Sequence, residues 1–228
     1  MQITKNLVAK LLRLFTLAIA SFMILSIVSV LFLRFFNPPF TSFMIWESNF
    51  FQKKISYNWI PIEDTGENIA LSVVATEDTR FCNHIGVDIK EIYQVIKKGE
   101  KRGASTITQQ LAKNIFLWPG RSWSRKIVEL YFTFLIEVII PKRRILEIYL
   151  NIVETSKLTF GVNEASKKYY KKPSKKLTKN QAVRIALTLP NPKIRNPKKL
   201  KSYLGQRIYR LKKDMDILKK DDRSSCFL

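Results

Sequence analysis

The sequence contains little cysteine and almost no histidine. Cys82 and Cys226 are the only cysteines, and their spacing suggests no metal site. They could pair in an oxidising compartment, but Cys226 lies in a polar C-terminal segment, and we expect both thiols to be free. His84 is the only histidine. Because no second histidine or obvious nucleophile lies beside it, a structural hydrogen bond is favoured over a catalytic role.

Acidic residues are also scarce. The 228 residues include 40 lysines and arginines but only 18 aspartates and glutamates, which gives a net charge of +22. A surface this basic is expected to meet a polyanion, either nucleic acid or phosphate-bearing lipid. The content of 46% hydrophobic and 12% aromatic residues is that of a folded protein. The length allows one membrane segment and one domain of ordinary size.

One long stretch lacks charge altogether. Leu14–Leu33 is uncharged and mostly apolar, and it is long enough to cross a bilayer as a helix. A cleaved signal peptide is the alternative, but the apolar segment before the small-residue triplet Ala18–Ala20 is too short for one. We therefore expect an uncleaved transmembrane helix over 14–34. More positive charges precede the span than follow it closely, so residues 1–13 are expected to be cytoplasmic.

The membrane span changes the interpretation of the charge. A domain exported across a membrane rarely meets nucleic acid, whereas basic residues beside a membrane are drawn to anionic lipids. We therefore expect anionic membrane lipids and lipid diphosphates as partners, and no nucleic acid. A non-enzymatic basic module that binds nucleic acid or lipid is the alternative that charge alone supports.

Helical spacing dominates the rest of the chain. Residues 35–66 are expected to be a connector near the membrane, with Phe43–Trp46 at the lipid interface. A folded domain over 67–220 follows, and 221–228 is expected to be a flexible tail. Alternating strands are nearly absent, so the predicted class is mainly α. The expected helices are one that starts at Glu67, then Trp123–Ile140, Lys142–Val153, Lys179–Leu189 and a last amphipathic helix over Leu204–Leu218. The helix over Trp123–Ile140 is apolar on most faces, and we expect it to be central and largely buried.

Three polar segments interrupt this pattern. Gly103–Asn114 combines small residues, hydroxyls, two adjacent carboxamides and a lysine. Glu77–Gly86 precedes it, and Arg121–Glu129 follows it. A hydrophobic core has no use for such a mixture, because every buried polar group needs a partner. A cleft that holds a polar, sugar-bearing ligand does need it.

The third segment concentrates positive charge. Arg121, Arg125 and Glu129 are spaced to share one face of a helix. A solvated ladder of ion pairs is the alternative. Lys113 and Lys126 add to the same neighbourhood, and four cations around one acid suit a diphosphate, to which arginine offers bidentate contacts.

The first segment supplies the carboxylates. Glu77 could act as a general base, while Glu77 or Asp78 could equally be a helix N-cap or an ion-pair partner of Arg80 or Arg102. In the second segment, Ser105 or Thr106 is expected to cap a helix running through Gln109 to Asn114. Displacement of a diphosphate from a sugar needs cations and one base. Hydrolysis of a glycosidic bond would instead need a carboxylic acid that protonates the leaving oxygen. The cations therefore favour transfer.

These segments resemble the motifs of the monofunctional peptidoglycan glycosyltransferases, the biosynthetic transglycosylases related to one domain of bifunctional penicillin-binding proteins. The resemblance runs from about Asn68 to Pro192. It is carried by Glu77–Asp78 with Phe81, His84 and Gly86, by Gly103 with Ser105–Leu111, Lys113 and Asn114, by Arg125–Lys126 with Glu129, and by Ile145–Glu147 with Tyr149–Asn151. The segment Thr155–Thr159 departs from the glycine-rich run usual in the family. No Ser-x-x-Lys or Lys-Thr-Gly motif of a transpeptidase is present.

The resemblance implies a lysozyme-like, two-lobed helical domain that polymerises glycan from lipid II at the outer face of the inner membrane. It implies that Glu77 deprotonates the acceptor hydroxyl and that Glu129 orients the cations or helps to position a divalent ion. The implied substrate-binding residues are Lys113, Arg121, Arg125 and Lys126 for the diphosphate, and Ser105, Gln109, Gln110 and Asn114 for the donor sugar. No obligatory cofactor or protein metal site is expected, although Mg²⁺ or Mn²⁺ could take part. Lipid II, lipid-linked glycan and other cell-wall synthesis proteins are the implied partners. A membrane-anchored, lysozyme-type enzyme that cleaves glycan is the alternative.

Overall fold

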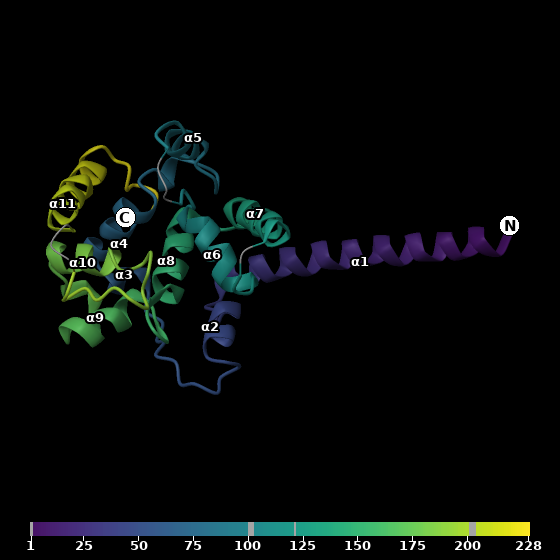
Figure 1. The fold of residues 1–228 in the computed structure, drawn as a ribbon, viewed down its shortest axis with the longest axis horizontal. Coiled ribbons are helices and arrows are strands. Elements are labelled where there is room, and N and C mark those ends of the chain that lie inside the picture. The colour runs from purple at the N-terminus through teal and green to yellow at the C-terminus, as the bar shows by residue number, and fades with distance from the viewer. Residues whose placement is uncertain (1, 100–102, 121, 201–203) are drawn as a thin grey trace.

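The computed structural model describes residues 2–99, 103–120, 122–200 and 204–228. The described part is mainly helical, as predicted, with one two-stranded sheet (Figure 1). The elements in chain order are α1 (Gln2–Phe35), α2 (Ser42–Glu47), α3 (Ile62–Thr65), α4 (Glu67–Glu77), η1 (Phe81–Asn83), α5 (Ile89–Lys97), α6 (Ile107–Phe116), α7 (Trp123–Ile139), α8 (Lys142–Ile152), β1 (Glu154–Ser156), β2 (Thr159–Phe160), α9 (Val162–Tyr170), η2 (Ser174–Lys176), α10 (Lys179–Ala186) and α11 (Gly205–Lys220).

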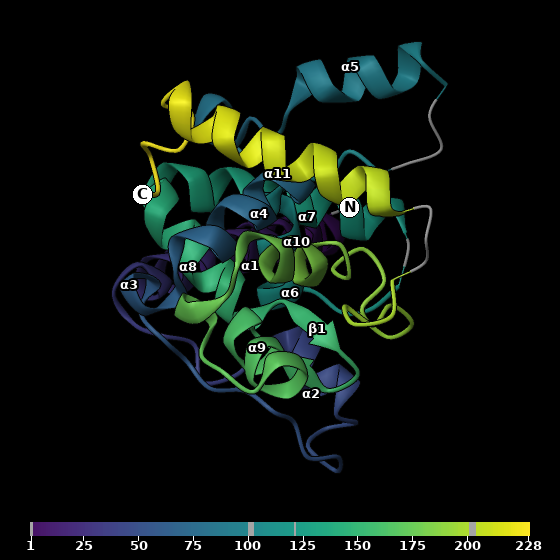
Figure 2. The same cartoon turned by 90° about the vertical axis from the view of Figure 1, so that its left-hand side faces the viewer.

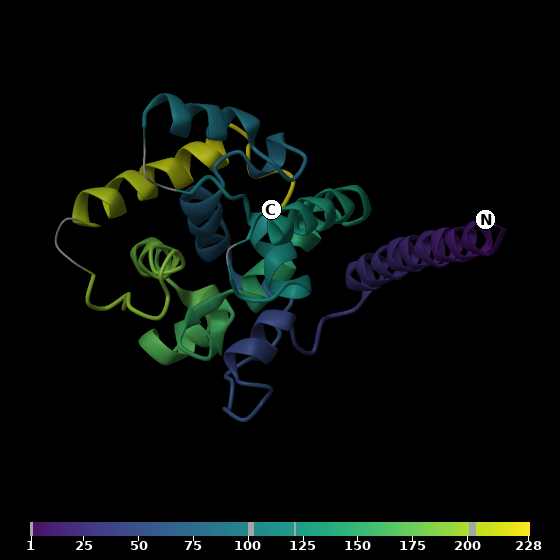
Figure 3. The same ribbon diagram turned by 45° about the vertical axis from the view of Figure 1, so that its right-hand side comes forward.

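The N-terminal helix α1 leaves the folded body as a single long rod (Figure 3). It continues through the expected segments 1–13 and 14–34 without a break. Asn6–Phe35 is long and apolar enough to cross a membrane, and it is the one such helix among the described residues. Its last turns pack against α7, where Ser26 and Tyr131 share a hydrogen bond. Arg34 also donates to the Ile139 carbonyl across 2.9 Å.

The core surrounds α4, whose apolar residues are buried from Ile69 to Ala75. Helix α4 packs against α10 and α11, and α11 lies across both of them (Figure 2). The predicted buried positions of the last helix are confirmed, since Ile208, Leu211, Met215 and Leu218 face this core. Helix α4 is buried on every face over residues 69–75, whereas α11 buries one apolar stripe, and this burial is the physical reason that the helices pack together. The end of α4 is thereby held in a fixed place.

The expectation that α7 is central and largely buried is wrong. Its bounds agree with the prediction, but only Glu129, Phe132, Thr133 and Ile136 are buried. The opposite face exposes large apolar side chains, including Trp123 at 87% and Val138 at 78%. An all-apolar helix can avoid water inside a protein or inside lipid, and the sequence does not distinguish the two. Helix α7 also packs against the apolar helix α1, through Tyr131 and Phe132.

The connector over 35–66 is folded rather than extended. Its helix α2 packs against α6, and Met44 is fully buried in the core, so Met44 does not lie at a lipid interface. Trp46 is exposed, and its position at the lipid interface stays a prediction. Thr41 caps α2 by accepting from the Met44 backbone N–H across 3.2 Å. The connector therefore packs as part of the folded domain, whereas it was expected only to join that domain to the membrane span.

The C-terminal residues are not a flexible tail, and the cysteines are not free. Cys82 and Cys226 form a disulfide. Phe227 is 1% exposed and packs near the Phe81 ring, while Arg143 donates to the Phe227 carbonyl across 3.0 Å. This apolar anchor returns the chain to η1 and brings the two sulfur atoms together. The spacing of the two cysteines in the sequence does not indicate that the C-terminus packs beside η1.

Candidate functional site

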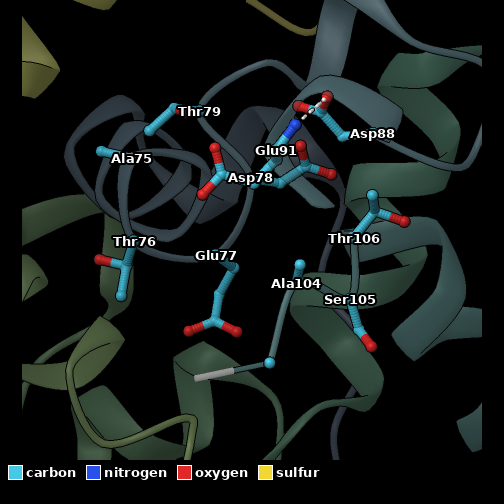
Figure 4. Close-up of a pocket in the computed structure, with 11 residues that line it drawn as sticks. Ala75, Thr76, Glu77, Asp78, Thr79, Asp88, Glu91, Ala104, Ser105 and Thr106 are labelled. Atoms are coloured by element: carbon cyan, nitrogen blue, oxygen red, sulfur yellow. Dashed lines mark hydrogen bonds between the residues drawn. The ribbon is translucent and has the colours of Figure 1, made fainter. Parts of the chain in front are cut away.

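The carboxylate of Glu77 lies at the C-terminal end of α4, where two cavities meet. One cavity of about 190 Å³ is bounded by the end of α4, by Asp88 and Glu91 of the α5 segment and by Gly103–Thr106 (Figure 4). Glu77 and Ser105 also line a second cavity of about 390 Å³. Figure 4 shows the adjacent carboxylates of Glu77 and Asp78 pointing in different directions. The N-cap alternative does not apply to Glu77, which ends a helix.

The surroundings of Glu77 set its protonation. Burial raises the pKa of its carboxyl, opposed by a hydrogen bond from Gln110 and by the positive charges of Arg207 and Arg195. Gln110 Nε2 donates to Glu77 Oε2 across 2.9 Å. The buried hydroxyl of Tyr149 in turn donates to Gln110 Oε1 across 2.8 Å. This chain of hydrogen bonds fixes the carboxylate, and a raised pKa suits a group that exchanges protons near neutral pH.

Asp78 has a structural role. Its Oδ2 accepts from the Ile107 backbone N–H across 3.0 Å at the N-terminus of α6, where a negative charge is favoured. Its Oδ1 shares a 2.8 Å hydrogen bond with His84 Nε2, which confirms the structural role expected for the histidine. Arg80 pairs with Asp88 across 3.3 Å rather than with Asp78. Asp78 thus joins the first two polar segments and leaves Glu77 to face the cavities.

The second polar segment divides its side chains between the fold and the site. Thr106, not Ser105, is the N-cap of α6, and Gln109 completes a capping box by accepting from the Thr106 N–H across 3.0 Å. Gln109 is buried, at 3% exposure, and lines neither cavity. Asn114, on the same helix, is also buried, at 5% exposure, and lines neither cavity. Ser105 and Gln110 do line the second cavity.

The predicted cation cluster is present on α6 and α7. Arg125 Nη1 pairs with Glu129 Oε2 across 3.1 Å, and Lys126 pairs with Glu129 Oε1. Glu129 is 3% exposed, so the three charges form a partly buried group rather than a solvated ladder. Arg125 Nε is buried and has no partner among the described residues. Arg121, expected to join this cluster, lies outside the described residues.

Lys113 connects the cluster to Glu77. Burial lowers the pKa of the Lys113 ammonium, and the positive charges of Arg125 and Lys126 lower this pKa further. The negative charges of Glu129 and Glu77 raise it. The lysine therefore experiences the fields of both carboxylates, the paired Glu129 and the cavity-facing Glu77. The group therefore contains three positive charges and a single negative charge, that of Glu129; the positive charges belong to Lys113, Arg125 and Lys126. An anion that reached this place would find an excess of cations close to a carboxylate.

Sequence reasoning missed three residues of the site. Tyr149 was quoted only as part of a helical motif, although its burial within α8 beside Gln110 makes it the support of Glu77. Arg195 and Arg207 line the cavity at Glu77 from the segment before α11 and from α11 itself. Nothing in the sequence distinguishes them from the many other cations of the C-terminal region. The capping-box signal at Thr106 and Gln109 could have separated Gln109 from Gln110.

Comparison with known proteins identifies the family of this chain. The family model described as transglycosylase matches residues 47–216. A protein of Pasteurella multocida named biosynthetic peptidoglycan transglycosylase is 38% identical over 90% of this chain and 87% of its own. Proteins of the same name from Shewanella frigidimarina and a Marinomonas species are 45% and 42% identical, over 77% and 88% of this chain and 77% and 89% of their own. The site and the matches together place this chain in the transglycosylase family.

Proposed function

We propose that this transglycosylase polymerises peptidoglycan glycan from lipid II. The lipid-linked growing strand is the donor, and the 4-hydroxyl of an incoming lipid II is the acceptor. The observation that supports this most is the pairing of a supported, cavity-facing carboxylate, Glu77, with an adjacent excess of cations around Lys113. The relatives' shared name describes the same chemistry.

Glu77 takes the proton of the acceptor hydroxyl as that oxygen attacks the anomeric carbon of the donor. A new bond forms from the acceptor oxygen to this carbon, while the bond from the carbon to the diphosphate oxygen breaks. Attack from the face opposite the leaving group inverts the centre. Undecaprenyl diphosphate departs with the electron pair, and the charge that develops on it is stabilised by Lys113, Arg125 and Lys126, with Arg121 as a further expected contact.

A raised pKa alone would serve an acid as well as a base. A lysozyme-type hydrolase would use a protonated Glu77 to donate to a glycosidic oxygen, and it would have no need of cations beside the reacting carbon. Lys113 and the α7 cations stabilise a negatively charged leaving group instead. They would also help to keep Glu77 ionised. The electrostatics therefore favour transfer over cleavage.

Glu129 orients cations in this proposal. Both of its carboxylate oxygens are engaged, one by Arg125 and one by Lys126. This arrangement favours the orienting role over the role of metal ligand, and among the described residues no group of three His, Cys, Asp or Glu side chains is placed to hold an ion. Ser105 lines the cavity at Glu77, and we assign it to the donor sugar in this proposal. Polymerisation assayed with and without Mg²⁺ or Mn²⁺ measures whether a divalent ion takes part.

The exposed apolar face of α7 supports a location at the membrane surface. Trp123, Ile127 and Val138 are each more than two-thirds exposed and lie on the helix that α1 contacts. With α1 as a single-pass anchor in the inner membrane and a cytoplasmic N-terminus, this face meets the outer leaflet and the domain is periplasmic. The cation cluster at the start of α7 then lies close to the lipid headgroups, where lipid diphosphates are found. Anionic lipids and other cell-wall synthesis proteins are further partners, and no transpeptidase activity is expected.

Purified protein incubated with labelled lipid II tests the proposal. We expect long glycan strands from the wild type and roughly a thousandfold lower rate from Glu77→Gln, because a general base contributes on the order of 10²–10⁴. Glu63→Gln, which alters an exposed carboxylate, is the matched control and should retain the wild-type rate. Full activity of Glu77→Gln would remove Glu77 as the base. Digestion of preformed glycan to short fragments, without synthesis, would establish the hydrolase instead.

A further inference from the structure

The cavity of about 390 Å³ at Glu77 contains two cations that the transfer step does not use. Its lining residues are Thr76, Glu77, Gly103, Ser105, Gln110, Pro190, Arg195 and Arg207. Arg195 belongs to the segment that follows α10, and Arg207 belongs to the first half of α11. These elements lie at the opposite end of the body from α1 and α7 (Figure 1). Lys113, Arg125 and Lys126 do not line this cavity.

The two guanidinium groups are available for a ligand. Arg207 is exposed and has no carboxylate within ion-pair distance among the described residues. Arg195 is half-buried, and its Nη1 donates to the Leu187 carbonyl across 2.8 Å, which holds the side chain in place. Guanidinium groups bind oxyanions through paired N–H donors. Two of them in one cavity make a position suited to a carboxylate or a phosphate.

The orientation of the substrate decides between these anions. The diphosphates of donor and acceptor are attached to lipid tails, so they must stay near the membrane, on the side of α1 and α7. The sugar at the reacting carbon bears the diphosphate at one end and the rest of the strand at the other. Lipid II, the proposed substrate, is a disaccharide that carries a short peptide and is joined to undecaprenyl diphosphate. Only the water-soluble strand and its peptides can therefore extend toward α10 and α11. A peptide linked through its amino end carries a free carboxylate.

We propose that Arg195 and Arg207 bind a peptide carboxylate of the glycan strand and so hold the strand in register with Glu77. This assignment rests on the function proposed above and adds a specificity-determining contact to it. The arginines are positioning residues for the strand. The enzyme would thereby prefer strands whose peptides keep their carboxylates free over strands in which these groups are amidated.

Initial polymerisation rates with two substrates test this assignment. One is lipid II with free peptide carboxylates, and the other is lipid II with those carboxylates converted to amides. For Arg207→Gln we expect about a tenfold higher KM with the free-carboxylate substrate and a kcat within about twofold of wild type. With the amidated substrate, the wild type should already show the higher KM and Arg207→Gln should add nothing. Rates are measured at pH 8.5, because the charge of Arg207 also acts on Glu77.

Two further variants sharpen the result. Arg210→Gln removes an exposed arginine from the same helix that does not line the cavity, and it should behave as wild type with both substrates. Arg207→Lys keeps the charge but loses the paired N–H donors, and its KM for the free-carboxylate substrate should lie between those of the wild type and Arg207→Gln. An equal effect of Arg207→Gln on both substrates, or an effect on neither, would overturn the assignment. Absence of glycan synthesis by the wild type would instead refute the proposed function itself.

Discussion

The hydrogen bond from Gln110 to Glu77 predicts a specific change in the pH profile. Gln110→Met keeps the length of the side chain but removes the 2.9 Å hydrogen bond to Glu77 and the 2.8 Å one from Tyr149. The bond to Glu77 is among the interactions that lower the pKa of a carboxyl whose burial raises it. Without it the pKa of Glu77 rises further. Since the base must be ionised, the acidic limb of the rate profile moves to higher pH.

The size of the shift follows from the strength of the lost bond. A hydrogen bond to a charged group contributes about 1.5 kcal/mol or more, and 1.36 kcal/mol corresponds to one pH unit. The limb should therefore move up by about one pH unit, with a further fall in the plateau rate because the carboxylate loses its support. Initial rates of lipid II polymerisation between about pH 4.5 and 9 measure both effects. Tyr149→Phe should produce a smaller shift in the same direction.

The neighbouring carboxamide provides the control. Gln109 bonds to the Thr106 backbone in the capping box and does not contact Glu77. Gln109→Met should lower the free energy of unfolding by about 1 kcal/mol, and with it the melting temperature, because the Thr106 N–H loses its partner, while the acidic limb should not move. An unchanged limb in Gln110→Met, or a shift to lower pH, would refute the assignment of Glu77 as the base supported by Gln110.

Three other predictions concern stability and charge. Cys226→Ser should lower the free energy of unfolding by about 2–4 kcal/mol, and adding Cys82→Ser should cost little more, because one disulfide is lost in either case; additive losses in thermal unfolding would contradict this. Burial raises the pKa of Glu154 to about 7, although the positive charge of Lys193 lowers it. In the folded protein Glu154 therefore keeps a proton that it releases near pH 4.5 in the unfolded chain. The free energy of unfolding should thus fall as pH rises from about 4.5 to 7. In urea unfolding, Glu154→Gln should be more stable than the wild type by about 2 kcal/mol at pH 8 and equally stable at about pH 4. Equal stability of the two proteins at about pH 8 would contradict this. Lys113→Met should reduce the polymerisation rate at least a hundredfold with an unchanged or higher melting temperature, because burial already disfavours the charge; a large fall in melting temperature would indicate a structural lysine.

The sequence predicted several helices closely. Helices α4, α8 and α11 were located to within a few residues, although only α11 has a single buried stripe, because α4 over residues 69–75 and α8 over residues 148–152 are buried on every face. Helix α7 was predicted over Trp123–Ile140 and spans Trp123–Ile139, yet its burial was misjudged. Apolar residues on all faces are equally compatible with a protein core and with lipid. Helices α5 and α9 were missed because each is short and mostly polar or exposed.

Long-range closure was beyond the reach of sequence spacing. The pairing of Cys82 with Cys226 depends on where Phe227 packs, and the return of the C-terminus is set by Arg143 on α8. Within the site, the adjacent residues Gln109 and Gln110 turn to different partners because successive helical positions point about 100° apart. One therefore caps α6 while the other reaches Glu77. The residue types identified the site, but their division between fold and chemistry required the structure.

The adjacent carboxylates Glu77 and Asp78 show why that division matters. Asp78 accepts a hydrogen bond from the Ile107 N–H at the N-terminus of α6 and shares a second one with His84. Both of its carboxylate oxygens are therefore occupied by contacts that tie the first two polar segments together. Glu77 accepts one hydrogen bond from Gln110 and keeps an oxygen toward the cavity. Burial makes its anion less stable, so it gains more from taking a proton. In the proposed mechanism the first carboxylate therefore performs the chemistry, and the second fixes the loop that presents it.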